Sequence, residues 1–121
     1  MKILLVEDDL FTRRLIKEHL VSEGHTVVEE NNVGTALFDL DHEVFDLLIT
    51  DIILPIDDGT MLIQHARKKG LPMPILAITG GLENAQEDYV KYAELHADQV
   101  LQKPISKERL IETLKLMVPK G

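Results

Sequence analysis

The apolar residues of the chain fall into segments in which two kinds of spacing alternate. Short apolar runs of four to six residues favour buried strands. Longer segments, with apolar residues at every third or fourth position, are typical of helices with one buried face. The predicted strands span 2–6, 26–29, 45–50, 74–79 and 99–102, and the predicted helices span 9–22, 33–40, 60–69, 84–95 and 106–118.

Turn-forming residues lie at the boundaries of these segments. Gly24 and Gly70 follow the first and third helices, where a glycine often ends a helix, and Ser106 stands where a hydroxyl can cap the last one. Asp9 is either an N-cap or a metal ligand, and we prefer the cap. Alternating strands and helices predict a parallel sheet covered on both faces, with its ligand site at the carboxyl ends of the strands.

Charged and hydroxyl side chains follow four of the predicted strands. Glu7 and Asp8 come after the first strand and Asp51 after the third, while Thr79 ends the fourth and Lys103 follows the fifth. Neighbouring strands are about 4.8 Å apart, so these side chains can converge at one edge of the sheet. The sequence therefore predicts one site built from distant parts of the chain.

The residue types at this edge indicate a divalent cation and an anion together. Crowded carboxylates repel one another unless a cation joins them, and carboxylate oxygens completed by water suit Mg²⁺. A lysine and a threonine hydroxyl aimed at the same place suit the oxygens of a phosphoryl group. Asp51 is the expected nucleophile, because carboxylates form acyl phosphates.

Composition and charge exclude several classes of function. The chain has 121 residues, 45% of them hydrophobic, which predicts a single domain over 1–121 with its own core. It has no cysteine, so disulfides, thiolate metal sites and cysteine nucleophiles are excluded. The net charge of −8 argues against direct nucleic-acid binding. Since no apolar run is long enough to cross a bilayer, we expect a cytoplasmic protein without membrane contact.

Four pieces of the sequence, taken together, carry a resemblance that covers essentially the whole chain. They are LLVEDD at 4–9 with Arg13 beyond it, DIILP at 51–55 with Asp-Gly at 58–59, PILAIT at 74–79, and Lys-Pro at 103–104. The combination resembles the receiver domains of two-component response regulators, which have a chemotaxis-regulator-like fold. The resemblance implies a doubly wound, flavodoxin-like α/β fold, with a five-stranded parallel sheet in the order 2-1-3-4-5 and five helices.

The resemblance also implies a role for each metal-binding residue. Asp51 matches the phosphoacceptor, Asp8 the direct Mg²⁺ ligand and Glu7 a ligand acting through water. Ile53, two positions after the phosphoacceptor, matches the residue whose backbone carbonyl binds the metal.

Two further residues match parts of the family's site that contact the phosphoryl group. Thr79 matches the switch hydroxyl, and Lys103 matches the lysine that bridges to the phosphoryl group. The family's Lys-Pro bond is usually cis, which is the minority form for X-Pro bonds in general.

The same resemblance implies signalling partners. A histidine kinase or a histidine phosphotransfer protein is the expected donor, and a downstream protein reads the surface of the fourth helix, fifth strand and fifth helix. Val100 stands where the family often has an aromatic residue, which calls readout by an aromatic rotamer into question. The chain ends soon after the fifth helix, so we expect a stand-alone regulator or a receiver fragment without an output domain.

Two other functions are compatible with parts of the pattern. A haloacid-dehalogenase-like phosphatase also uses an aspartate nucleophile and Mg²⁺, but it typically has a second aspartate two positions later, where this chain has Ile53. Isoleucine cannot transfer a proton. A flavin or nucleotide binder would need a glycine-rich phosphate loop after the first strand, where Glu7 and Asp8 would repel phosphate.

Overall fold

A computed structural model describes residues 1–54, 58–80 and 87–117, and its elements alternate as the sequence predicts. Residues 55, 84–86 and 118, which belong to the predicted pattern, lie outside this range. The strands are β1 (Lys2–Val6), β2 (Thr26–Glu30), β3 (Leu47–Asp51), β4 (Ile75–Thr79) and β5 (Gln99–Gln102). The helices are α1 (Leu10–Ser22), α2 (Val33–His42), α3 (Thr60–Lys68), α4 (Glu87–His96) and α5 (Lys107–Met117).

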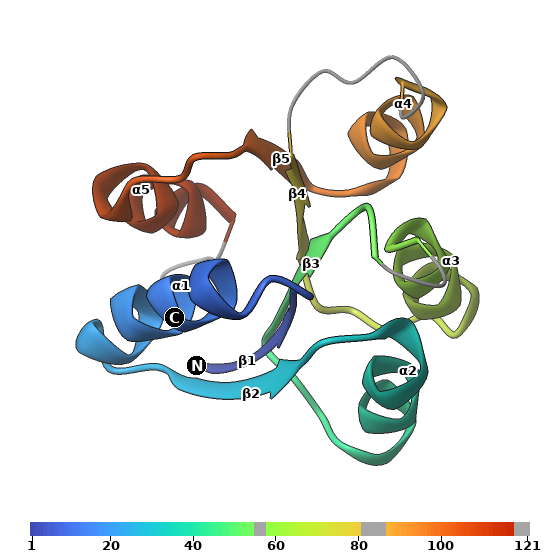
Figure 1. Ribbon diagram of the computed structural model, residues 1–121. Coiled ribbons are helices and arrows are strands. Elements are labelled where there is room, and N and C mark those ends of the chain that lie inside the picture. Colours follow the sequence, from blue (N-terminus) through green and yellow to red (C-terminus); the bar gives the residue numbers. More distant parts are fainter. Residues whose placement is uncertain (55–57, 81–86, 118–121) are drawn as a thin grey trace.

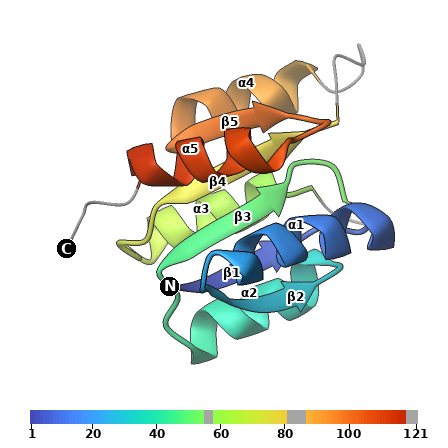
Figure 2. The same ribbon diagram turned by 90° about the vertical axis from the view of Figure 1, so that its left-hand side faces the viewer.

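All five strands belong to one parallel sheet in the order β2-β1-β3-β4-β5, which confirms the predicted topology. The side view shows the strands pointing the same way, so their carboxyl ends share one edge (Figure 2). The strand order reverses direction between β1 and β3. In open sheets of this kind a ligand site forms at such a switch point, beyond the carboxyl ends of the strands.

Helices cover both faces of the sheet. Helices α1 and α5 lie on one face, and α2, α3 and α4 lie on the other (Figure 1). Each interface has its own apolar core, because successive residues of a strand point to opposite faces. The central strands β3 and β4 are buried along their whole length, which explains their nearly continuous apolar sequences.

The helices are short and have polar caps at several ends. The Asp9 carboxylate accepts a hydrogen bond from the Thr12 amide (2.8 Å), so the preferred interpretation of Asp9 as an N-cap is confirmed. Ser106 Oγ accepts a bond from the Arg109 amide (3.1 Å) at the start of α5. Gly24 has a φ of 88° just after α1, which glycine adopts without strain. None of the described helices is long and apolar enough to cross a lipid bilayer.

Two details of the predicted pattern were wrong. The third strand begins at Leu47, and Phe45 is buried without belonging to it, because Asp46 pairs with the backbone of Lys2 through its own amide and carboxylate. On α1, the apolar residues whose spacing predicts the amphipathic helix are Leu10, Leu15, Ile16 and Leu20. Only Ile16 and Leu20 of these are buried, whereas Leu10 and Leu15 are 50% and 38% exposed. The apolar residues of α1 therefore extend over a wider part of the helix surface than the part that packs against the sheet.

The buried centre of the sheet should dominate stability. Replacing Ile49, which is fully buried in β3, by alanine should lower the free energy of unfolding by about 2–5 kcal/mol, because it leaves a cavity between the sheet and the α1–α5 layer. Replacing Val44, which is 88% exposed, by alanine should change the free energy of unfolding by less than about 0.5 kcal/mol. Urea unfolding of both variants measures this, and equal losses would contradict the described core.

Candidate functional site

Three charged residues at or just beyond the ends of different strands point to the same side of the sheet at its carboxyl edge. Glu7, Asp51 and Lys103 each follow, by two positions, a strand residue of the core beneath α1 and α5. Those core residues are Leu5, Ile49 and Leu101. Since side-chain direction repeats every two residues along a strand, the sheet itself aims the three charged groups at one another.

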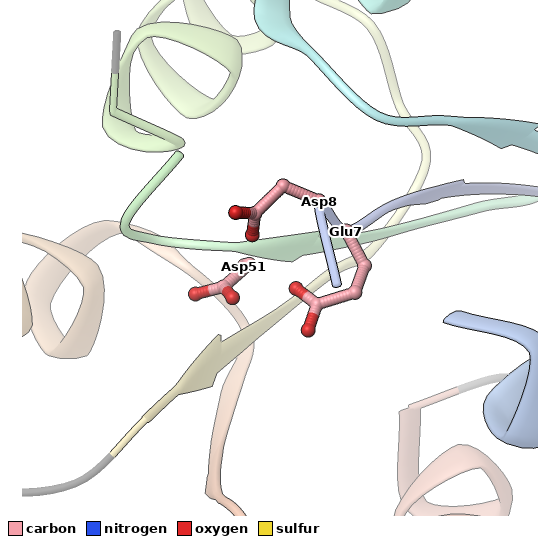
Figure 3. Close-up of side chains that lie close together, drawn as sticks. All are labelled: Glu7, Asp8 and Asp51. Atoms are coloured by element: carbon pink, nitrogen blue, oxygen red, sulfur yellow. The ribbon is translucent and has the colours of Figure 1, made fainter. Parts of the chain in front are cut away.

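Three carboxylates form a cluster at this edge. Glu7, Asp8 and Asp51 each offer an oxygen within 4.8 Å of the others, and Figure 3 shows their carboxylates gathered together. Glu7 and Asp51 are almost fully buried, whereas Asp8 is exposed. The cluster thus has two buried carboxylates and one exposed carboxylate. The sequence predicted that these three groups converge, and their role as metal ligands stays a prediction.

Lys103 completes the cluster with a positive charge. Its ammonium donates a hydrogen bond to Asp51 Oδ2 (2.8 Å) and another to Glu7 Oε1. Burial lowers the pKa of Lys103, but the bonds to the two carboxylates outweigh burial and leave the pKa above its usual value. The lysine is therefore charged and lies against the predicted nucleophile. Its bond to Pro104 is cis, as the resemblance implied.

Glu7 lies in surroundings that disfavour the charged form of its side chain. Burial, followed by its contact with Asp51, raises the pKa of Glu7 to about 8, although Lys103 acts in the opposite direction. Its second oxygen, Oε2, is buried and has no hydrogen-bond partner among the described residues. An unpartnered buried oxygen beside two further carboxylates suits a hard divalent cation that binds oxygen, such as Mg²⁺.

The turn after β3 brings the backbone close to Asp51. The amide of Ile53 donates a hydrogen bond to Asp51 Oδ1 (3.1 Å), and Ile53 forms an antiparallel bridge with Asp58. Gly59 packs so tightly here that an added Cβ atom would overlap the Asp51 carbonyl oxygen. Sequence reasoning recognised Gly59 as part of a motif but missed this close approach, which an Asp-Gly pair beside the nucleophile could have suggested.

Thr79 occupies a different position from the charged residues. It lies at the buried end of β4, next to β3, and in the alternation of β4 it falls on the side of Ile75 and Ala77, which face α2–α4. None of the hydrogen bonds among the described residues joins its hydroxyl to the carboxylates. Val100, predicted as the unusual position of β5, is half-buried against the same core.

A comparison with protein families identifies the chain from its sequence. Residues 3–115 match the model of the response regulator receiver domain. The chain belongs to this family. Receiver domains of response regulators are signalling domains that generally have an acidic pocket, and the described residues of this chain include the acidic cluster of Glu7, Asp8 and Asp51.

Individual relatives agree with this assignment. The receiver domain is 33% identical to the transcriptional regulatory protein PcoR of Escherichia coli, over 97% of this chain and 51% of that protein. It is 34% identical to SilR of Salmonella typhimurium, a probable transcriptional regulatory protein, over 100% and 52% of the two lengths. The chain thus spans about half the length of these curated relatives.

Solved structures show the same fold. A CheY-like receiver domain protein from Methanospirillum hungatei superposes with a TM-score of 0.85 at 29% identity, covering 95% of this chain and 90% of that one. Chemotaxis protein CheY4 of Vibrio cholerae gives a TM-score of 0.83 at 25% identity, covering 97% and 98%. The chemotaxis-regulator-like fold inferred from the sequence is therefore confirmed.

The raised pKa of Glu7 should make the metal-free protein less stable as the pH increases. The unfolded glutamate releases its proton near pH 4.5 and the folded one near pH 8. Stability gained from the protonated form is therefore complete below about pH 4.5 and is lost as the pH rises to about 8. Urea unfolding in EDTA across this range should show the decline.

The variant Glu7→Gln should flatten this part of the profile, because an amide does not titrate. Glu18→Gln, at an exposed position on α1, is the matched control and should keep the wild-type slope. An unchanged slope in Glu7→Gln would assign the pH dependence to another group.

The close approach of Gly59 should not tolerate a side chain. Gly59→Ala forces the backbone of Asp51 to move, and we expect a loss of roughly 1–3 kcal/mol of unfolding free energy. Gly80→Ala, where a Cβ atom meets nothing within 4 Å, is the control and should have little effect. Chemical denaturation compares the two, and a neutral Gly59→Ala would show that the turn is looser than described.

Proposed function

We propose that Asp51 of this receiver domain accepts a phosphoryl group in a Mg²⁺-dependent reaction. The observation that supports this most strongly is the meeting of Glu7, Asp8 and Asp51 with the charged Lys103. A cluster that only held a cation would gain nothing from an ammonium in direct contact with it. A site that holds first a cation and then a cation together with a phosphoryl group needs the negative carboxylates for the cation and the positive ammonium for the phosphoryl oxygens.

The transfer uses the oxygen of Asp51 as the nucleophile. That oxygen attacks the phosphorus of a phosphohistidine, the N–P bond breaks, and the released imidazole nitrogen takes up a proton. An acyl phosphate is left on Asp51, and attack by water on phosphorus later returns the carboxylate and inorganic phosphate. The Lys103 ammonium meets the charge that develops on the phosphoryl oxygens, and the Thr79 hydroxyl donates to another oxygen once the group is present.

The metal would be held by Asp8, by Asp51 and by the backbone carbonyl of Ile53, with Glu7 acting through water. The unpartnered oxygen of Glu7 and the raised pKa of this residue support this donor set. When bound, Mg²⁺ neutralises charge on the carboxylates and on the phosphoryl oxygens during transfer. Glu7 must release its proton before the cation binds, which links metal affinity to pH.

The proposed partners follow from the family. A histidine kinase or histidine phosphotransfer protein donates the phosphoryl group, and a downstream protein reads the surface of α4, β5 and α5. We place this exchange in the cytoplasm, with residues 1–121 as one functional domain that stands alone or forms part of a longer regulator. PcoR and SilR are transcriptional regulatory proteins of about twice this length, so control of transcription is one output compatible with such a regulator.

The phosphatase alternative has less support. Its general acid would stand two positions after the nucleophile, where Ile53 contributes an amide hydrogen bond to Asp51 and has no titratable group. The match to the receiver domain family over residues 3–115 does not favour that alternative either.

Phosphorylation can be measured directly by intact mass after incubation with acetyl phosphate and Mg²⁺. The wild-type protein should gain one phosphoryl group, and Asp51→Asn should gain none. Asp46→Asn, which removes a carboxylate bonded to the backbone of Lys2, is the control and should behave like wild type. Continuous release of phosphate from esters without a stable adduct, or labelling of Asp51→Asn, would contradict the proposal.

A further inference from the structure

Arg13 on α1 reaches back over the start of its own helix to the end of β1. Its Nη1 donates a hydrogen bond to the backbone carbonyl of Glu7 (3.0 Å), and its Nε donates one to Glu29 Oε1 (3.3 Å). The Arg13 side chain is only 16% exposed. The guanidinium is thus held between two strands rather than extended into solvent.

The ion pair with Glu29 fixes the direction of Arg13. Glu29 lies on β2, opposite Leu5 of β1, and its other oxygen binds the Lys17 ammonium (2.9 Å). Burial acts to raise the pKa of Glu29, but the two cations outweigh it and hold the pKa below its usual value. Glu29 is therefore charged, and it orients the planar guanidinium so that one nitrogen faces the Glu7 carbonyl.

The bonded carbonyl belongs to the peptide that links Glu7 to Asp8. The bond from Arg13 restricts the backbone torsions on either side of this peptide, ψ of Glu7 and φ of Asp8. These two torsions set how the neighbouring side chains lie relative to each other, and both side chains carry carboxylates of the acidic cluster. Arg13 also stands near the amino end of α1, where the helix dipole disfavours a cation. A guanidinium at this place, directed at the Glu7–Asp8 peptide, is better suited to orienting that peptide than to stabilising the helix.

We propose that Arg13 is a positioning residue for metal binding, which holds the Glu7–Asp8 peptide so that both carboxylates face Asp51. The inference rests on the proposed Mg²⁺ site and goes beyond it, because Arg13 touches neither the cation nor the phosphoryl group. Groups behind the ligands of a metal commonly set its affinity by fixing the ligands in place.

Two variants separate this role from a general contribution to folding. Arg13→Ala removes both the bond to the Glu7 carbonyl and the ion pair with Glu29. Lys17→Ala removes an ion pair with the same Glu29 but leaves the bond to the Glu7 carbonyl in place. Thermal unfolding of the metal-free proteins gives the effect on folding, and calorimetric titration with MgCl₂ gives the affinity for Mg²⁺.

We expect Arg13→Ala to weaken Mg²⁺ binding by about tenfold, the lower end of the usual effect of such outer groups. Lys17→Ala should bind Mg²⁺ with an affinity within about twofold of that of wild type. We expect this even if its melting temperature falls as far as that of Arg13→Ala. Arg13→Lys keeps a charge for Glu29 but has a single nitrogen, so it should fold and still bind Mg²⁺ more weakly than wild type.

The outcomes distinguish this inference from the proposed function. If wild type binds Mg²⁺ and both Arg13 variants bind it as tightly as wild type does, the inference is overturned while the proposed metal site stands. Equal weakening by Lys17→Ala would also overturn it, because the effect would then follow the loss of any Glu29 ion pair. If wild type itself does not bind Mg²⁺, the proposed metal site and the inference fail together.

Discussion

The contact of Lys103 with two buried carboxylates is the interaction on which the site depends. Glu7 follows β1, and Asp51 ends the neighbouring strand β3. Burial first, and then the contact with Asp51, disfavours the charged form of Glu7 and raises its pKa. Lys103 follows β5 at the edge of the sheet and reaches past β4 to meet them. Removing one partner of such a group leaves an uncompensated buried charge, which is strongly unfavourable.

The rest of the fold keeps these charges together. The apolar central strands give the carboxyl edge a rigid base, since β3 and β4 are buried along their whole length. Contacts on two sides hold the backbone beside the carboxylates: Gly59 allows the chain to pack against Asp51, and Arg13 binds the peptide between Glu7 and Asp8. Strand order brings the groups near one another, and these local contacts set their orientation.

Much of this arrangement could be predicted from the sequence because it follows from periodicity. Alternating apolar spacing indicated the parallel sheet, and the position of polar residues after strands indicated Glu7, Asp51 and Lys103. Contacts that depend on packing between elements could not be predicted in this way. The pairing of Arg13 with Glu29 requires knowledge of how α1 crosses β2, and the exposure of Leu10 depends on how far the sheet extends beneath α1.

Thr79 illustrates a third kind of limit. Its place at the end of β4 follows from the strand pattern, yet its side chain falls on the opposite alternation from Asp51 and Lys103. The alternation of the sheet therefore does not direct the hydroxyl toward Asp51. A role that depends on a bound group is therefore harder to predict than a cluster of fixed charges.

Anomalous diffraction from crystals soaked in Mn²⁺, which binds oxygen ligands as Mg²⁺ does, locates the cation without reference to activity. A single strong peak between the carboxylates of Asp8 and Asp51, next to the Ile53 carbonyl, is the result expected from the geometry of the cluster. A peak at another place, or an empty cluster at saturating metal, would contradict the view that this edge of the sheet is built around a divalent cation.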